Sequence, residues 1–300
     1  MMKILACGIA AGMVLFSANA AYAAKPASSV TVNIGEATVT AFQDATGEFP
    51  LSLFKGADEA EIRALVPTGK LAGTVNVFMV QTGGKTILVD TGNGPRGKNN
   101  NGALPALLNK AKVKPEKVDI VLLTHLHGDH VGGLLKGDKA LFPKAEVLVG
   151  KQELDFWTDP AMLEKFPGRE QNVLLVAKFL GAYESRVKTF NFEETVAPGI
   201  VALPIIGHTP GHTLFELTSA GRRLFFWGDL THSSTVQFRN PDIYATYDMD
   251  PKAASAVRRK IMEKAAVENV PVAGAHLTFP GIGMVEKNPE GGFVFQLGVK

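Results

Sequence analysis

Hydrophobic residues recur along the chain in short runs, and most of these runs have the length and flanking residues of β-strands. Residues 118–123 are almost all apolar, as in a strand that is buried on both faces. Two pairs of runs are separated by glycine-containing turns, and each pair predicts a β-hairpin: residues 75–80 with 86–89, and 213–218 with 222–227. Further strands are expected at residues 30–41, 146–149, 200–206, 270–275 and 293–297.

Longer segments with helical spacing lie between these runs. The clearest covers residues 251–268, which start with Pro251 and carry Val257, Ile261 and Ala265 at intervals of four. Other helices are expected at residues 58–65, 103–111, 151–157 and 171–182.

The two halves of the chain echo one another. Each contains a hairpin followed by an aspartate, Asp90 in the first half and Asp229 in the second. Each then continues through a helix to a strand that ends near a histidine, His125 or His276. Two strand-rich halves with outer helices predict two packed β-sheets with helices outside, an α+β fold. No low-complexity linker divides residues 24–300, so we expect them to form a single domain.

The N-terminus has the pattern of a secretory signal peptide. A basic start at Lys3 is followed by thirteen uncharged residues, 4–16, and by the small-x-small sequence that ends at Ala23. The apolar run is shorter than the ~20 residues that span a bilayer. We therefore expect residues 1–23 to be removed, leaving a secreted, periplasmic protein without a stable membrane anchor.

The composition limits the classes of partner and the types of metal ligand that the chain can use. The 31 basic and 29 acidic residues give a net charge of +2, which lacks the basic excess of a nucleic-acid-binding protein. The one cysteine, Cys7, lies within the signal peptide. Any metal site in the mature chain must therefore use histidine, carboxylate or backbone oxygen ligands.

The strongest chemical signal is the segment 124–130, Thr-His-Leu-His-Gly-Asp-His, which directly follows the buried strand. Residues two apart on an extended segment point the same way, so His125 and His127 can bind one metal ion. Asp129 and His130 follow as the chain turns and can reach a second ion a few ångströms away. This spacing predicts a metal site.

The other histidines and Asp229 stand in turns or at strand ends. His208 and His212 flank a Thr-Pro-Gly turn, and Asp229 and His276 each follow a strand. A single histidine at a strand end is more often a structural polar residue than a ligand. The cluster at His125, however, requires ligands from distant segments, so we expect these side chains to gather at one end of the sheets.

Five of these motifs resemble the metallo-β-lactamase superfamily: residues 88–92, 124–133, 209–213, 228–229 and 275–276. Residues 155–157, 207–213 and 275–283 resemble, more narrowly, the methyl parathion hydrolase group. The resemblance implies an αββα sandwich, with mixed sheets, helices on both outer faces and a two-metal site at one edge. The resemblance is also compatible with a homodimer.

The resemblance also implies roles for individual residues. The first metal would be bound by His125, His127 and His212, the second by Asp129, His130 and His276, and Asp229 would bridge both. Asp90 would orient the metal-binding loop, a role that tunes ligands in such sites. His208 and His232 are not ligand positions in this pattern; His232 could face the pocket, the surface or a ligand. Zinc suits this donor set best, with manganese, iron or cobalt as alternatives.

The implied activity is hydrolysis of an ester, a lactone or an organophosphate triester by a hydroxide that bridges the two metals. Asp129 and Asp229 would be the catalytic carboxylates, and Asp129 could accept a proton. A β-lactamase or another hydrolase of the superfamily is an alternative. A di-iron oxidoreductase on the same scaffold would favour glutamate at position 127 and a fused flavin domain, and the chain has neither. A secreted metal-binding protein without activity also stays open.

Aromatic residues suggest a small neutral or apolar substrate. Five are expected near the site: Phe49, Phe54, Phe156, Trp157 and Phe179. Each is equally compatible with a place in the core. Trp157 is the strongest pocket candidate, because it lies in a short segment flanked by polar residues.

Overall fold

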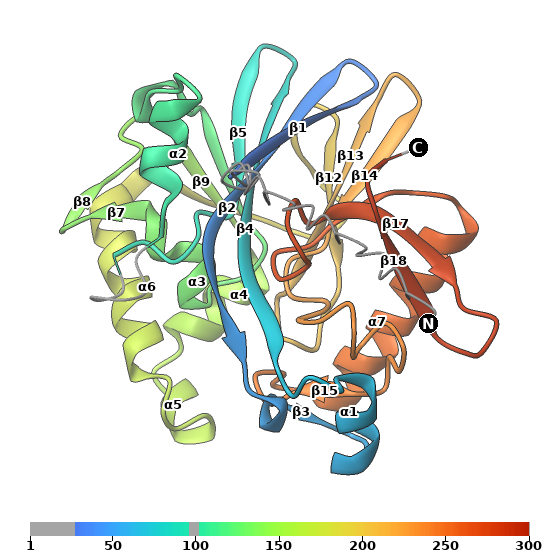
Figure 1. The fold of residues 1–300 in the computed structure, drawn as a ribbon. Helices are drawn as coiled ribbons and strands as arrows, with labels where there is room; N and C mark the ends of the chain where they lie inside the picture. Colours follow the sequence, from blue (N-terminus) through green and yellow to red (C-terminus); the bar gives the residue numbers. More distant parts are fainter. Residues whose placement is uncertain (1–27, 96–101, 300) are drawn as a thin grey trace, which may run out of the picture.

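The computed structural model describes residues 28–95 and 102–299, and in these residues two seven-stranded β-sheets pack face to face (Figure 1). The first sheet has the order β1 (Ser29–Ile34), β2 (Ala37–Phe49), β4 (Leu71–Thr82), β5 (Lys85–Val89), β6 (Ile120–Leu123), β9 (Glu146–Gly150) and β10 (Val187–Phe190). The second has the order β11 (Thr195–Ala197), β12 (Ile200–Pro204), β13 (Thr213–Ser219), β14 (Arg222–Phe226), β16 (Val272–Ala273), β17 (Ile282–Lys287) and β18 (Phe293–Leu297).

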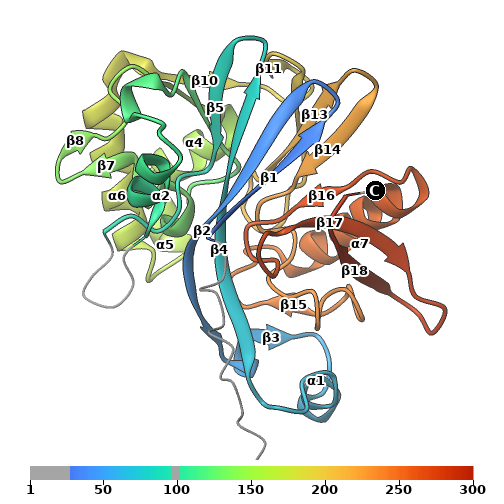
Figure 2. The same ribbon diagram turned by 45° about the horizontal axis from the view of Figure 1, so that its top comes forward.

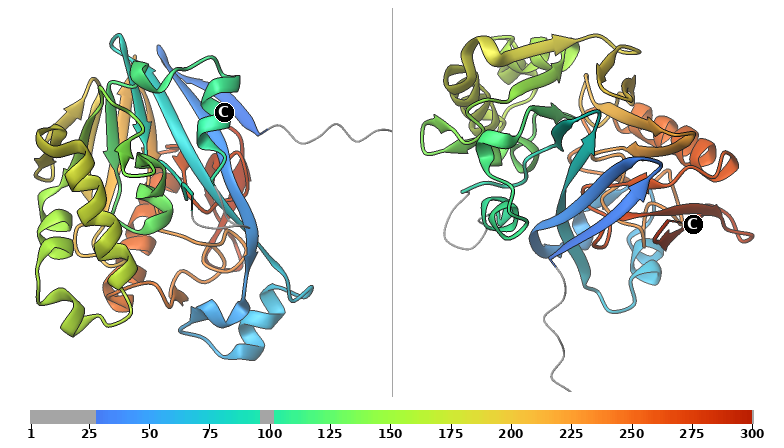
Figure 3. Two further views of the ribbon diagram at one scale, coloured as in Figure 1. Left: turned by 90° about the vertical axis from the view of Figure 1, so that its left-hand side faces the viewer. Right: turned by 90° about the horizontal axis from the view of Figure 1, so that it is seen from above.

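Helices cover the outer face of each sheet (Figure 3). The first sheet carries α2 (Leu104–Lys110), α3 (Gly128–Val131), α4 (Lys151–Thr158), α5 (Met162–Lys165) and α6 (Glu170–Tyr183). The second carries α7 (Pro251–Val267). The predicted α+β sandwich, with mixed sheets and helices on both outer faces, is therefore confirmed.

The core is divided into layers by the alternation of side chains along the strands. Val121 and Leu123 of β6 pack against the helices of the first sheet, whereas Leu122 packs between the two sheets. In β14, Phe225 packs toward α7, and Phe226 packs between the sheets. Successive residues of a strand point to opposite faces, so a strand buried on both sides must be apolar throughout. The prediction for residues 118–123 rests on this pattern.

The echo between the two halves is present in the topology. In the first sheet β4 pairs antiparallel with β5, and β5 pairs parallel with β6. In the second sheet β13 pairs antiparallel with β14, and β14 pairs parallel with β16. Parallel neighbours end at the same edge of a sheet. Each half therefore brings an aspartate and a histidine to that edge.

Some elements differ from the prediction. Residues 30–41 form two strands rather than one, because Gly35 turns the chain with φ +58°, where a side chain would collide with the carbonyl oxygen of Ser219. β2 and β4 also extend well past their apolar runs. Their far ends lead to an extension built from β3 (Phe54–Lys55), α1 (Glu59–Leu65) and β15 (Tyr244–Ala245), which has its own small core (Figure 2).

The signal peptide predicted at residues 1–23 lies outside the described residues. A short hairpin of β7 (Leu135–Lys136) and β8 (Lys139–Ala140) completes the strands that the structure describes. Among the helices of residues 28–95 and 102–299, none combines the length and the hydropathy that crossing a membrane requires.

Candidate metal centre

Asp90 fastens the loop that carries the histidine motif. It follows β5 in a left-handed conformation, with φ +60°. Its carboxylate accepts hydrogen bonds from the main-chain N–H of Thr124 at 2.8 Å and from the Thr124 hydroxyl at 2.8 Å. It also accepts one from Nδ1 of His130 at 2.8 Å. Asp90 therefore fixes the His130 ring with its other nitrogen, Nε2, toward the centre of the site, the arrangement that resemblance assigned to it.

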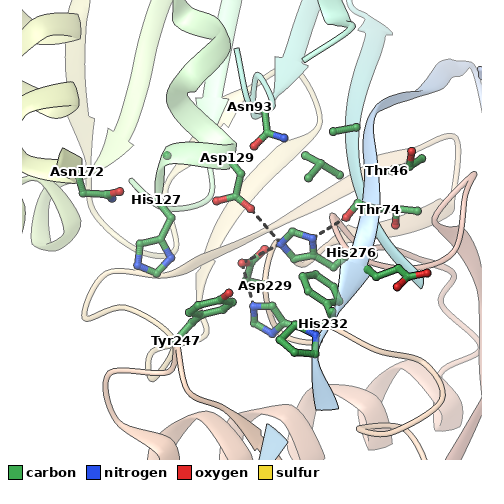
Figure 4. Close-up of a pocket in the computed structure, with 18 of the residues that line it drawn as sticks. Thr46, Thr74, Asn93, His127, Asp129, Asn172, Asp229, His232, Tyr247 and His276 are labelled. Carbon is green, nitrogen blue, oxygen red and sulfur yellow. Dashed lines mark hydrogen bonds and ion pairs between the residues drawn. The ribbon is translucent and has the colours of Figure 1, made fainter. Parts of the chain in front are cut away.

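Two groups of side chains have their ligand atoms close enough to hold a metal ion, and Asp229 belongs to both. The first group contains His125, His127, His208 and Asp229, and the second contains Asp129, His130, Asp229 and His276. In each group the ligand atoms lie within 4.8 Å of one another. Figure 4 shows Asp229 between His127 on one side and His276 with Asp129 on the other.

The second group is held rigidly. His276 directs Nδ1 to the carbonyl oxygen of Thr74 at 2.7 Å, which fixes its ring. Its Nε2 then lies 3.2 Å from Oδ2 of Asp229 and 3.4 Å from Oδ2 of Asp129. His130 Nε2 lies 3.0 Å from Oδ1 of Asp229 and 3.8 Å from Oδ2 of Asp129, yet neither His130 Nε2 nor Asp229 Oδ1 makes a hydrogen bond within the described residues. Buried nitrogen and oxygen atoms that converge without a hydrogen bond fit the ligands of a bound cation.

Electrostatics in the second group favour a positive charge. Burial by itself would raise the pKa of Asp229, but His130, His276 and His125 outweigh it and hold this pKa well below its usual range. Burial would lower the pKa of His276, but Asp229 and Asp129 outweigh it and raise this pKa to about 10. A divalent cation would take the place of the protons that these carboxylates otherwise retain on the histidines.

The first group contains a histidine that the sequence prediction left out. Nε2 of His208 lies 2.9 Å from Nδ1 of His127 and 3.3 Å from Oδ2 of Asp229. His212, assigned to this metal by resemblance, instead has Nε2 at 3.2 Å from the main-chain N–H of Asp229, and its Nδ1 has no partner in the described chain. The repeated histidine in His-Thr-Pro-Gly-His was the available signal, and sequence spacing does not say which of the two rings comes closer.

His208 is held by a buried ion pair. Its Nδ1 lies 2.8 Å from Oδ1 of Asp248, and the other oxygen of Asp248 accepts a hydrogen bond from Arg258 of α7 at 3.1 Å. Arg258 also donates to three main-chain carbonyl oxygens, those of Leu230, Pro241 and Ile243. A histidine ligand commonly donates its second ring nitrogen to a carboxylate in this manner. The sequence analysis did not identify Asp248 or Arg258.

Glu153 connects the two histidine-bearing loops and was also missed. Its carboxylate is fully buried and accepts four hydrogen bonds. The donors are the main-chain N–H of Leu126 at 2.9 Å, Trp157 Nε1 at 2.8 Å, the Thr209 hydroxyl at 2.7 Å and the main-chain N–H of Gly211 at 2.9 Å. Burial raises the pKa of Glu153, and these four bonds act against that rise. One side chain thereby sets the distance between the His125 loop and the His208 turn.

A pocket of about 410 Å³ opens over the two ligand groups. His127, Asp129, Asp229, His232 and His276 contribute to its lining. Asn172 and Tyr247 stand on one side, and Thr46 and Thr74 stand on the other (Figure 4). Phe49, Pro50 and Val75 add apolar surface, and Arg169 is the cation that lines it. The pocket is therefore of mixed polarity, with more hydrogen-bonding groups than the sequence analysis expected.

Of the five aromatic residues predicted near the substrate, Phe49 lines this pocket and the other four do not. Trp157 and Phe179 are buried in the core between the first sheet and its helices, and Phe156 packs at the edge of the same core. Phe54 is buried in the core of the extension. The prediction was wrong for these four, because an apolar ring on a helix or strand has the same sequence signature in a core as in a pocket.

Trp157 supports the site from behind. Its ring packs edge-on against His127, with centroids 5.7 Å apart, and its Nε1–H donates to Glu153. Trp157→Phe should therefore lower the free energy of unfolding by about 2 kcal/mol, through lost volume and a lost buried hydrogen bond. The ratio of kcat/KM between aromatic and aliphatic substrates should not change. Urea unfolding and kinetics on both substrate types test this, and a selective loss of aromatic substrates would contradict it.

Comparisons with known proteins agree with this geometry. The family model described as "Metallo-beta-lactamase superfamily" matches residues 71–274. The crystal structure of the hydrolase AbOPH, described as in the beta lactamase superfamily, is 32% identical, with a TM-score of 0.85 over 92% of this chain and 100% of that one. The structure of AidC, described as a dizinc quorum-quenching lactonase in complex with a product, is 26% identical, with a TM-score of 0.83 over 91% of this chain and 98% of that one.

A curated relative is the beta-lactamase-like protein 2 homolog of Caenorhabditis elegans, which is 34% identical over 191 residues. The match covers 63% of this chain and 55% of that protein. The chain thus spans about half the length of this relative.

Proposed function

This chain belongs to the metallo-beta-lactamase superfamily, and from that premise we propose that it is a two-metal hydrolase that opens lactones or cleaves related esters. The family supports a metal-dependent hydrolase. The observation that carries the proposal is the pair of ligand groups joined by Asp229 at the base of a pocket of substrate size. The lactone is favoured because AidC, similar over nearly its whole length, is described as a lactonase.

The donor set fits two divalent ions, with zinc as the first choice because imidazole and carboxylate are its usual nitrogen and oxygen ligands. Such ions, when bound, activate a water molecule and polarise the oxygen of the substrate. His125, His127 and His208 or His212 would hold one ion, and Asp129, His130 and His276 the other. Asp229 would touch both and keep them at a fixed separation.

The chain supplies the remaining functions through its own residues. Asp129 lines the pocket, and its side chain is 27% exposed, so this carboxylate can meet both a water molecule and a substrate. Neighbouring histidines outweigh its burial and keep its pKa well below the usual range. Asp129 is therefore ionised at neutral pH and can orient an attacking water by accepting a hydrogen bond from it.

The pocket suits a small substrate with one apolar and one polar part. Phe49 and Val75 offer apolar contact, whereas Arg169 and Asn172 offer hydrogen-bond donors. A lactone with an acyl or amide side chain combines these features. Because the sequence also resembles the methyl parathion hydrolase group, a phosphotriester is the second candidate. We also propose that the chain is exported to the periplasm, since residues 1–23 have the pattern of a signal peptide.

We expect the protein loaded with zinc to hydrolyse lactones faster than aryl esters, phosphotriesters or β-lactams. Kinetics on one substrate of each class, with the manganese, iron and cobalt forms in parallel, would measure this order. Removal of metal with a chelator should abolish hydrolysis, and added zinc should restore it, because the proposal assigns the attack on the substrate to a water molecule that the metal ions would activate. A protein that turns over none of these substrates in any metal form would refute the proposal. Oxygen consumption by the iron form would favour the oxidoreductase instead.

A further inference from the structure

Arg169 is a half-buried cation in the wall of the pocket. It directly precedes α6, and the main-chain N–H of Asn172 donates to its carbonyl oxygen at 3.0 Å. Its guanidinium reaches the main-chain carbonyl oxygen of Tyr247 with Nη2, at 3.5 Å. Asn172 and Tyr247 stand on the side of the pocket opposite Thr46 and Thr74 (Figure 4), so Arg169 belongs to that side as well.

The guanidinium of Arg169 lacks a counter-charge within the part of the chain that the structure describes. Its one hydrogen bond is at the outer limit of such bonds, and no acidic side chain of these residues pairs with it. Two other arginines that are withdrawn from solvent differ, since Arg258 meets Asp248 at 3.1 Å and Arg223 meets Glu268 at 2.7 Å. Burial lowers the pKa of Arg169, but a guanidinium stays charged in proteins. A partly desolvated charge without a partner is costly.

The acidic residues of the pocket lining are engaged elsewhere. Asp129 and Asp229 belong to the metal-binding groups, and Glu48 lies 3.6 Å from Lys70. The missing counter-charge therefore has to arrive with a ligand. A guanidinium presents five N–H donors in a planar fork that matches the two oxygens of a carboxylate, and Arg169 uses one of these donors within the protein.

We propose that Arg169 binds a carboxylate on the part of the substrate that does not react, so that the preferred substrates are lactones or esters with a free carboxylate group. This inference rests on the proposed function for the reacting bond, and on the described side chains for the position of the cation. A carboxylate is favoured over a neutral carbonyl because hydrogen bonds between two charged partners are about twice as strong. The sequence analysis expected a neutral substrate, because Arg169 belongs to none of its motifs.

Arg169→Gln and Arg169→Lys in the full-length, zinc-loaded protein test the proposal, with Arg63→Gln as the control. Arg63 is an exposed arginine of α1 that pairs with Glu59 and is not part of this pocket. Kinetics compare γ-lactones that carry carboxyalkyl side chains of increasing length with the matching carboxamides. Wild type and the control should prefer the carboxylates.

We expect Arg169→Gln to raise KM for the best carboxylate substrate about tenfold. The change in kcat should be small, because the contact does not involve the reacting bond. The carboxamides should be hydrolysed as by wild type. Arg169→Lys should recover part of the loss, since lysine keeps the charge without the fork. Zinc content and melting temperature should stay at the wild-type values, because the side chain makes one weak bond within the described chain.

Binding without turnover tests the contact independently of the proposed function. Calorimetry on zinc-loaded wild type and Arg169→Gln compares succinate, glutarate and adipate with butanoate, pentanoate and hexanoate. Wild type should bind one dicarboxylate about tenfold more tightly than the monocarboxylate of the same length, and Arg169→Gln should lose this difference. If wild type hydrolyses no substrate of any class, the proposed function fails, and this comparison still decides the role of Arg169.

Other outcomes would overturn the assignment. A wild-type protein that prefers the carboxamides, or that treats both substrate series alike, would exclude a carboxylate as the partner of Arg169. Loss of zinc or a lower melting temperature in Arg169→Gln, with all substrates affected equally, would make Arg169 a structural residue. Equal affinities of wild type for dicarboxylates and monocarboxylates, or binding of neither, would refute the contact.

Discussion

Asp229→Asn is expected to lose both metal ions together with about 10³-fold of kcat/KM, or roughly 4 kcal/mol of transition-state stabilisation. The reason is that Asp229 belongs to both ligand groups, and its two oxygens face histidines from each of them. An amide offers one neutral oxygen in place of two charged ones, and it leaves the charge of two cations unbalanced. Elemental analysis of the purified variant and steady-state kinetics with added zinc measure both effects.

The matched control is Asp138→Asn, which removes a carboxylate from the exposed turn between β7 and β8, where it meets Lys178 at 3.8 Å. That variant should keep two metal ions and the wild-type rate, because exposed ion pairs contribute little. If Asp229→Asn retained both metals, the shared position of Asp229 would have to be abandoned. If it lost only one, Asp229 would belong to a single metal.

Glu153→Ala should produce the largest loss of stability among single substitutions at the site, about 4 kcal/mol in the free energy of unfolding. The substitution leaves four buried donors without an acceptor, and each such group costs about 1–3 kcal/mol where relaxation or water does not compensate. The unfolding free energy of Glu153→Gln should lie between those of wild type and Glu153→Ala. The reason is that its NH₂ group would face donors on one side of the carboxylate position. Urea unfolding of the metal-free and metal-loaded proteins measures both.

Glu164→Gln provides the comparison, because Glu164 is an exposed residue of α5. Its unfolding free energy should stay within about 0.5 kcal/mol of wild type. A loss of less than about 1 kcal/mol for Glu153→Ala would mean that water or side-chain movement satisfies the four donors. Glu153 would then not be the residue that sets the distance between the two loops.

The fold and the two sheets could be predicted because their signals are local. Residues 120–123 form a strand buried on both faces, and the apolar run predicted at residues 118–123 indicates this directly. The hairpin turn at Gly83-Gly84 and the proline at the start of α7 likewise act within a few residues. Histidines and aspartates directly after strands were correctly expected at one edge, because parallel pairing fixes where strands end.

The rest of the site depends on contacts that form only when the helices and loops pack together. Glu153 meets Gly211 across 58 positions, and Arg258 of α7 reaches Asp248 only because α7 packs under that loop. Neither residue belongs to a motif, and both read in the sequence as ordinary polar positions on a helix. The prediction that Trp157 lines the pocket was wrong because its polar neighbours suggested exposure. One of them, Glu153, lies one helical turn before it and is the buried acceptor of its hydrogen bond.

The shared edge of the two sheets has a consequence for the coupling between metal binding and folding. Each ligand group takes side chains from both halves of the chain: His125, His127, Asp129 and His130 come from the half that forms the first sheet, and His208, Asp229 and His276 come from the half that forms the second. Neither half can complete either group alone. A bound ion therefore links the two sheets. It stabilises the folded state against their separation by RT ln(1 + [L]/Kd), where [L] is the concentration of free metal ion and Kd its dissociation constant. The stability of the fold therefore depends on the concentration of metal ions in the compartment. We expect the mature chain to have no cysteine, and hence no disulfide that could stabilise it instead.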